Sequence, residues 1–113
     1  MQSTIDQSNK SVNPLYGMTG KLKTKEGKSD EVVAILMKAS KLVSEAKGIH
    51  LYLVCKDVKA ADTIWVIEAW DTKEDHDNSL TMMGVKELIA RAMPLIDGKP
   101  EGVILDVIGG KGV

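Results

Sequence analysis

The sequence predicts a single α+β domain whose strands and helices follow the order β-α-β-β-α-β. A stripe of apolar residues with helical spacing fills residues 29–46. Two runs with the alternation and residue types of strands, 49–58 and 63–70, follow one another with a short polar gap. The chain of 113 residues is long enough for one domain with a substantial core and too short for two.

The first strand is expected at residues 15–24. This segment alternates loosely, with Tyr16, Met18, Gly20 and Leu22 on one side, which is typical of a half-buried strand with close backbone approach at its glycines. Residues 1–14 before it are polar and show no period. We therefore expect a flexible N-terminal arm at 1–14 and a folded domain at 15–113.

The first helix is expected to begin near Ser29, a plausible N-cap, with Asp30 and Glu31 where the helix dipole favours negative charge. Its apolar positions recur at spacings of three and four, and Lys47-Gly48 is a suitable C-terminal cap.

Both faces of the second and third strands are apolar. In residues 49–58 one face carries Ile49, Leu51, Leu53 and Cys55, and the other carries His50, Tyr52, Val54 and Lys56. The third strand, 63–70, follows a hairpin loop at 59–62 and has Trp65 and Ile67 opposite Ile64 and Val66. Helices can cover only one face of such a sheet, so we expect a homodimer whose uncovered sheet faces pack together.

The second helix is expected almost directly after the third strand, with Asp71 or Thr72 as its N-cap. His76, Leu80 and Met83 lie four and seven residues apart and would share the face that points to the sheet.

This helix should break or bend near Gly84 and end at Pro94. A last strand at 103–108 completes the order. With right-handed crossovers these elements form the ferredoxin-like fold, a four-stranded antiparallel sheet with helices on one face.

Composition excludes several classes of function. The 15 basic and 16 acidic residues give a formal charge of -1, which favours neither nucleic acid nor an anionic membrane as a partner. We find no apolar run long enough for a membrane span and no signal peptide, and we expect a cytoplasmic protein. The single Cys55 reads as a small buried hydrophobe, and two scattered histidines lack the spacing of metal ligands. We expect no bound metal or cofactor.

The candidate site residues cluster around the third strand and the second helix. His76 is the main candidate, although a lone inward histidine is more often a hydrogen-bonded core residue than a catalyst. Trp65 and Trp70 are separated by an odd number of residues and must face opposite sides of the sheet. At most one of them lines a cavity on the helix side. Arg91 and His50 read as surface residues.

The junction Glu68-Ala-Trp70-Asp71-Thr72-Lys73-Glu74, followed by His76-Asp-Asn-Ser79-Leu80, resembles the antibiotic biosynthesis monooxygenase family of small dimeric α/β-barrel proteins. The likeness covers about residues 16–108. In the family the helix histidine comes nine residues after the strand-ending aromatic, where this chain has Ser79. His76 lies three residues earlier, which is nearly one helical turn.

The resemblance implies an oxidoreductase that uses O₂ to oxygenate a quinol or a polyketide-type aromatic without flavin, haem or metal. His76 would be the base or a hydrogen-bond partner, and Trp65 or Trp70 an apolar wall of the substrate site. Tyr52, Asn78 and Arg91 would be polar contacts, and Leu80 and Met83 further apolar walls.

Two alternatives on the same fold stay open. One is a non-enzymatic protein that binds a small aromatic or serves as an accessory protein. The other, which the residues favour less, is haem degradation. That branch places a tryptophan inside the second helix and a histidine farther along it, where this chain has Asn78 and Leu88.

Overall fold

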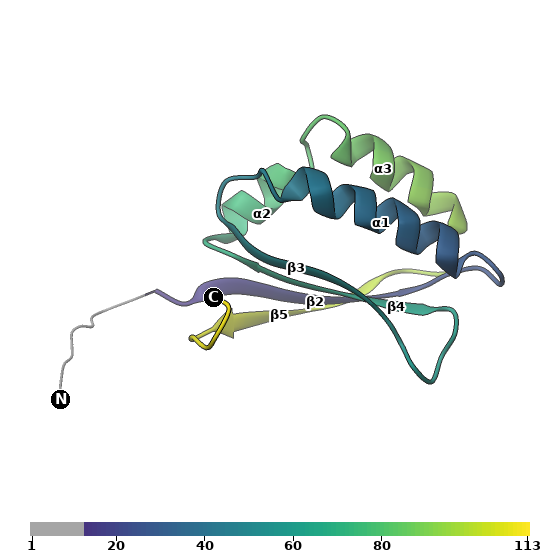
Figure 1. Ribbon diagram of the computed structural model, residues 1–113, viewed down its shortest axis with the longest axis horizontal. Helices are drawn as coiled ribbons and strands as arrows, with labels where there is room; N and C mark the ends of the chain where they lie inside the picture. Colours follow the sequence, from purple (N-terminus) through teal and green to yellow (C-terminus); the bar gives the residue numbers. More distant parts are fainter. Residues whose placement is uncertain (1–12) are drawn as a thin grey trace.

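The computed structural model describes residues 13–113, and all but the end of the predicted N-terminal arm lies outside the described residues. One antiparallel sheet carries the helices on a single face (Figure 1). The strands, in the spatial order β3-β4-β2-β5, are β2 (Leu15–Lys23), β3 (Ile49–Lys56), β4 (Thr63–Trp70) and β5 (Glu101–Val107). The helices are α1 (Ser29–Val43), α2 (Lys73–Ser79), α3 (Val85–Ala92) and the short 3₁₀ turn η1 (Met93–Leu95). The predicted ferredoxin-like fold is confirmed.

Cross-strand pairing decides which side chains face the helices. Tyr16 of β2 pairs with Trp70 of β4, and Met18 pairs with Glu68. Directly paired residues share a face, so the predicted alternation of β2 places Tyr16, Met18, Gly20 and Leu22 under the helix layer. β5 adds the outer edge and begins at Glu101, two residues before its predicted start.

Strand β3 carries an irregularity that its alternation does not reveal. The pairing register shifts between Ile49, which pairs with Trp70, and Leu51, which pairs with Ala69. This bulge turns Ile49 toward the helices, where it packs against a core cluster that contains Trp70. The prediction that Ile49 shares a face with Leu51 was therefore wrong. The strand also ends at Lys56 and not at residue 58, because the Asp57 side chain accepts a hydrogen bond from the backbone N–H of Lys59 and starts the hairpin turn.

The helices differ from prediction mainly at their ends. Ser29 is the first residue of α1 and not its cap, and α1 ends at Val43, with turns leading to Gly48. In α2 the predicted cap is present, because Thr72 Oγ1 accepts a hydrogen bond of 3.0 Å from the backbone N–H of Asp75. Pro94 falls in η1, directly after α3.

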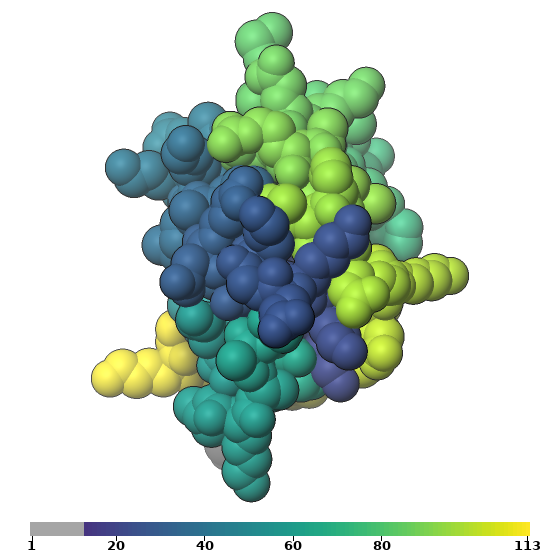
Figure 2. Space-filling view, turned by 90° about the vertical axis from the view of Figure 1, so that its right-hand side faces the viewer, coloured from purple at the N-terminus to yellow at the C-terminus, as the bar shows by residue number. Residues whose placement is uncertain are grey.

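The core lies between α1, α3 and the sheet. One cluster joins Ile35 and Ala39 of α1 to Leu88 of α3, and a second joins Val43, Trp70 and Val85. Seen from the end of the molecule, the helix layer forms one side, and the loop between β3 and β4 projects from the other (Figure 2). Within 13–113 no helix has the length and hydropathy that a membrane span requires.

Candidate functional site

A cavity of about 470 Å³ lies between the helix layer and the sheet. Its walls are almost entirely aliphatic, with Leu22 from β2, Ile35 from α1 and Leu88 from α3 among them. Among residues 13–113, three polar side chains line it, and they are Tyr52, Glu68 and Ser79. An apolar cavity with a few convergent polar groups is the usual form of a small-molecule site.

Glu68 is the central polar group of this cavity. Glu68 of β4 is the cross-strand partner of Tyr52 of β3, so both side chains point from the sheet toward the helices and into the cavity. The indole Nε1 of Trp70 donates a hydrogen bond of 2.9 Å to Glu68 Oε1. His76 Nε2 lies 3.9 Å from the same oxygen. The Glu68 carboxylate is thus hydrogen-bonded to Trp70 of its own strand and lies near His76 of the following helix.

Burial changes the acid–base character of both groups. Loss of hydration raises the pKa of the Glu68 carboxyl above its ordinary value, although the hydrogen bond from Trp70 and the nearby His76 oppose the change. Burial also raises the pKa of the Tyr52 hydroxyl, and the Glu68 charge raises it further. Tyr52 therefore stays a hydrogen-bond donor, while Glu68 is a carboxylate with an increased affinity for a proton.

His76 lies behind Glu68 and is not itself part of the cavity wall. Its ring is buried between two aromatic residues, with centroids 5.4 Å from Tyr16 and 5.9 Å, edge to face, from Trp70. On its other side, Nδ1 lies 2.9 Å from Asp77 Oδ1. The expected inward orientation of His76 is present, and the imidazole links a surface carboxylate to the buried one.

The two tryptophans lie on opposite faces of the sheet. Trp70 is fully buried on the helix side. Trp65 lies on the open face, where its Nε1 donates a 2.9 Å hydrogen bond to Asp57 and the Lys21 ammonium lies 5.6 Å from its ring centroid. Trp70 is therefore the tryptophan that supports the cavity, through Glu68.

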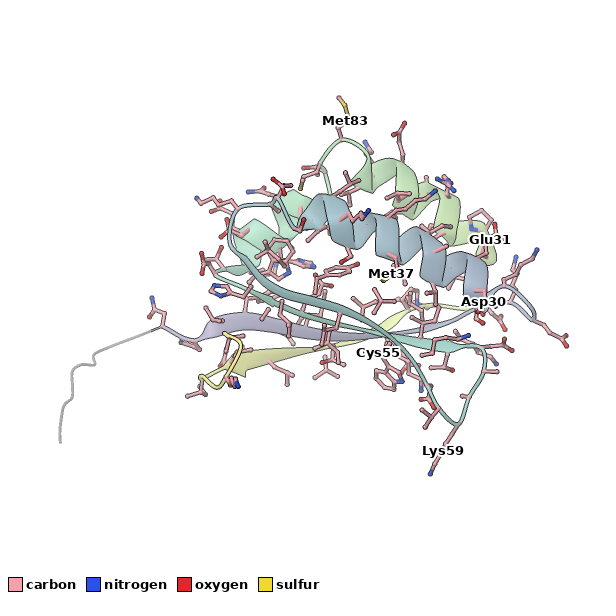
Figure 3. All side chains as sticks on the ribbon, in the orientation of Figure 1. Asp30, Glu31, Met37, Cys55, Lys59 and Met83 are labelled. Atoms are coloured by element: carbon pink, nitrogen blue, oxygen red, sulfur yellow. The ribbon has the colours of Figure 1, made fainter. Side chains whose placement is uncertain are left out.

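Of the predicted apolar walls on the second helix, Leu80 lies at the cavity and Met83 does not. Leu80 lines the cavity and is partly exposed at its rim. Met83 is 93% exposed and points away from the sheet (Figure 3), so the expectation that it walls the pocket was wrong. The reason is that α2 ends at Ser79, and the chain turns through Gly84, which has a φ of +89°, before α3 begins.

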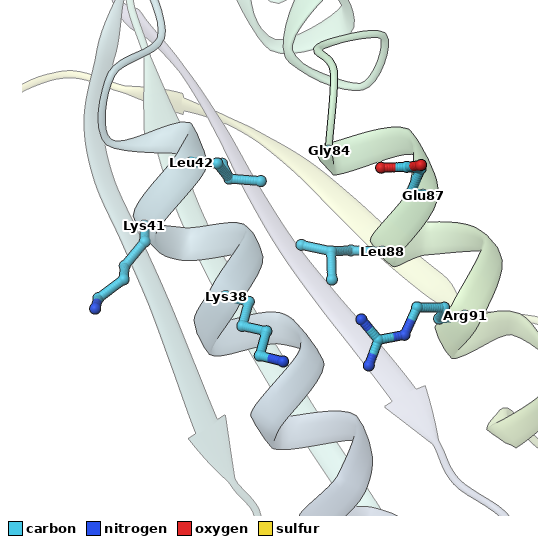
Figure 4. A pocket seen from close by; sticks show the side chains of 7 residues that line it. All are labelled: Lys38, Lys41, Leu42, Gly84, Glu87, Leu88 and Arg91. Atoms are coloured by element: carbon cyan, nitrogen blue, oxygen red, sulfur yellow. The ribbon is translucent and has the colours of Figure 1, made fainter.

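Asn78 and Arg91 also lie away from the cavity. Asn78 is exposed on α2. Arg91 belongs to a separate groove between α1 and α3, with Lys38 and Lys41 across from it (Figure 4). Neither side chain is among those that line the cavity holding Glu68.

Glu68 and Ser79 line the cavity but were not predicted as site residues, although the sequence carries a signal for each. Glu68 is two residues before Trp70 and so shares its face, and an acidic residue on the inner face of a buried strand is unusual. Ser79 occupies the position of the histidine in the related pattern, and it reaches the cavity that His76 does not. Within the described part of the chain no cluster of three potential metal ligands occurs.

A family model and a solved structure place the chain in one family. A family model for antibiotic biosynthesis monooxygenases matches residues 15–91. A solved structure from Chloroflexus aurantiacus J-10-fl, provisionally named an antibiotic biosynthesis monooxygenase, is 36% identical with a TM-score of 0.80, and the match covers 87% of this chain and 97% of that one. No curated protein matches the chain significantly.

Two more distant structures share the fold alone. A provisionally named antibiotic biosynthesis monooxygenase from Nitrosomonas europaea has a TM-score of 0.82 at 11% identity, with 88% of this chain and 96% of that chain covered. Another, from Caulobacter crescentus CB15, has a TM-score of 0.79 at 17% identity, with 87% and 93% covered.

Proposed function

Because the chain belongs to the antibiotic biosynthesis monooxygenase family, we propose that it uses O₂ to oxygenate a quinol or phenol bound in the cavity, without a bound cofactor. The observation that carries the proposal is Glu68, a carboxylate placed inside an otherwise aliphatic cavity beside Tyr52. Burying a carboxylate lowers the stability of the folded protein. Ionisable groups with perturbed pKa values are concentrated at functional sites, so a role in function accounts for Glu68 at this position.

The chemistry begins with proton transfer from the ring hydroxyl to Glu68. A carboxylate with a raised pKa is a better base toward a phenol than an exposed one. The resulting phenolate is electron-rich and gives electrons to O₂. One oxygen atom of O₂ enters the ring, the other leaves as water, and the ring becomes a quinone. The substrate supplies all the electrons, so the reaction balances without a further reductant.

The surrounding residues keep this reaction in order. Tyr52, still protonated, donates a hydrogen bond to the oxygen that develops negative charge. Trp70 fixes the Glu68 carboxylate by its indole hydrogen bond, and the aliphatic walls exclude water that would compete for the anion. His76 Nε2 lies 3.9 Å from Glu68 Oε1, so it can take the proton from Glu68 once the two side chains approach hydrogen-bond distance. The other ring nitrogen, Nδ1, faces the exposed Asp77 carboxylate and the solvent.

Oxygen uptake with a panel of quinols and phenols tests the proposal. Glu68→Gln keeps the shape of the side chain and removes the base, and it should lower kcat by about 10²-fold or more. His76→Ala should lower kcat less than Glu68→Gln and change the pH profile, because it removes only the relay. Asn78→Ala is the matched control for His76→Ala, because Asn78 is on the same helix but is exposed and does not line the cavity. It should leave oxygen uptake unchanged.

The rival function is binding without turnover. If wild-type protein binds the panel in the cavity but consumes no O₂ with any of it, the monooxygenase proposal is wrong. A small-aromatic-binding or accessory role would then account for the same cavity.

A further inference from the structure

The cavity is longer than a single aromatic ring, and its polar groups lie at one end only. Glu68 pairs with Tyr52 on one side and with Met18 of β2 on the other. Leu22, which also lines the cavity, lies four residues after Met18 along β2. Four residues of an antiparallel strand span about 13 Å. Beyond Leu22 the walls continue with Ile96 and Pro100, and no charged or hydroxyl-bearing side chain of the described residues lines that half.

Helix α3 runs along the cavity from its polar end to its far end. Val85, at the start of α3, belongs to the core cluster that contains Trp70. Ala92, at the end of α3, packs with Leu95 against the cluster that contains Ile35. Both residues line the cavity. A larger side chain at Ala92 would therefore take up space in the far half of the cavity and not at the polar end.

The residue types that line the cavity favour one kind of ligand. Tyr52 is the only aromatic residue among those that line the cavity, and it lies at the polar end. A flat fused-ring ligand would be better held by aromatic faces, whereas a flexible hydrocarbon chain packs well against Leu, Ile, Val and Met. The aliphatic residues at the rim, Leu80, Ile89 and Met93, extend the same surface to solvent.

We propose that the cavity takes an alkyl-substituted phenol or quinol, with the hydroxyl at Glu68 and Tyr52 and the alkyl chain running past Leu22 toward Pro100. The ring occupies the end at Glu68, and a chain of about five or six carbons fills the rest of the 13 Å. Leu22 and Ala92, which line the far half, then limit the accepted chain length. This inference rests on the proposed function only for the placement of the hydroxyl.

Calorimetric titration with 4-alkylphenols of increasing chain length, under anaerobic conditions, tests the inference without turnover. The Kd should fall about three- to fourfold for each added methylene and level off beyond about five or six carbons, where the chain reaches the rim. Phenols with fused rings, such as 2-naphthol, should bind more weakly than the alkylphenol of equal carbon number. A Kd that does not depend on chain length, or tighter binding of the fused-ring series, overturns the proposal.

Substitutions in the far half of the cavity locate the chain. Ala92→Leu should weaken binding of 4-hexylphenol at least tenfold and leave 4-methylphenol nearly unchanged, because the larger side chain occupies the far half and not the ring site. Leu22→Phe should act in the same direction and serves if Ala92→Leu does not fold. Ala90→Leu, exposed on the same helix as Ala92 and not among the lining residues, is the control and should change neither Kd. Equal weakening of both phenols by Ala92→Leu and Leu22→Phe contradicts the proposed path.

Binding and oxygen uptake separate this inference from the proposed function. If the Kd depends on chain length but no O₂ is consumed, the alkyl-chain site is supported and the monooxygenase proposal is rejected. If short quinols drive oxygen uptake but the Kd does not depend on chain length, the alkyl-chain site is rejected and the monooxygenase proposal is supported.

Discussion

At the scale of single residues, the Glu68 carboxylate lies where burial disfavours its charge. Its side chain is about 11% exposed, and its partners are a neutral indole and an imidazole at 3.9 Å. An apolar residue would fill the cavity at lower cost in stability. The protein is therefore less stable with Glu68 than with an apolar residue at this position, and such destabilising residues are expected at functional sites.

This cost should be measurable as a pH dependence of stability. The folded pKa of Glu68 is raised above the ordinary 4.5, so the folded state binds this proton more tightly than the unfolded state. The stability that the protonated carboxyl contributes is complete below about pH 4.5 and is lost as the pH rises through the folded pKa. Glu68→Gln does not ionise. Its melting temperature should equal that of the wild type in acid and exceed it increasingly as the pH rises through that window.

Thermal unfolding of both proteins across this pH range provides the measurement. Glu74→Gln removes an exposed carboxyl in the first turn of α2 and is the control for the loss of one negative charge. A gap between Glu68→Gln and the wild type that is constant with pH would mean that Glu68 titrates as an exposed carboxyl does.

At the scale of elements, the junction between β4 and α2 positions the site. The backbone N–H of Asp71 donates to the Gly48 carbonyl, and the Asp75 carboxyl of α2 packs directly against Gly48. Gly48 has a φ of +84°, which L side chains rarely adopt. One glycine thus allows the turn before β3 to lie against the first turn of α2, the helix that carries His76.

Gly48→Ala should therefore destabilise the protein strongly. The left-handed conformation costs about 1 to 2 kcal/mol for alanine, and the new Cβ would lie 2.7 Å from Asp75 Cγ. Together these should lower the free energy of unfolding by more than about 3 kcal/mol. Gly27→Ala is a matched control, because Gly27 has a φ of +77° and nothing within 4 Å. Equal losses in urea unfolding for the two variants would show that Asp75 does not restrict Gly48.

Local patterns predicted the elements well because helix and strand periods depend on neighbouring residues. The alternation of β2 and the stripe of α1 each reflect burial of one face, and both were read correctly. The bulge after Ile49 was not readable, since a register shift depends on the partner strand. The separation of His76 from Met83 was missed for a similar reason, because the early end of α2 depends on how the chain crosses to α3.

The site was predicted in part. The strand-to-helix junction fixed His76 and Trp70 close together, because only a short turn lies between them. Glu68 and Tyr52 meet only through pairing of β3 with β4, and the aliphatic cavity needs α1 and α3 in place. These long-range relations have no local sequence signal.

At the scale of the whole molecule, the sheet face that the helices leave uncovered exposes apolar side chains that the cavity does not account for. Leu53 of β3 is 45% exposed, and Val103 and Leu105 of β5 are 58% and 47% exposed. Trp65 and Ile67 of β4 lie between them on the same face, as the pairing shows. A contiguous apolar surface of this kind marks an interface, and a sheet face suits a copy of itself related by a two-fold axis.

We therefore expect a homodimer in which two open faces pack together, and light scattering at micromolar concentration should give about twice the 12.3 kDa chain mass. Leu53→Glu places a charge in the middle of the buried surface, where neither water nor a partner charge is available to it. Because Leu53 is already exposed in the single chain, this variant should stay folded and become monomeric. Met83→Glu adds the same charge at a position that is 93% exposed on the helix side and should stay dimeric. A wild-type protein that scatters as a monomer, or a Leu53→Glu variant that remains a dimer, would contradict packing through this face.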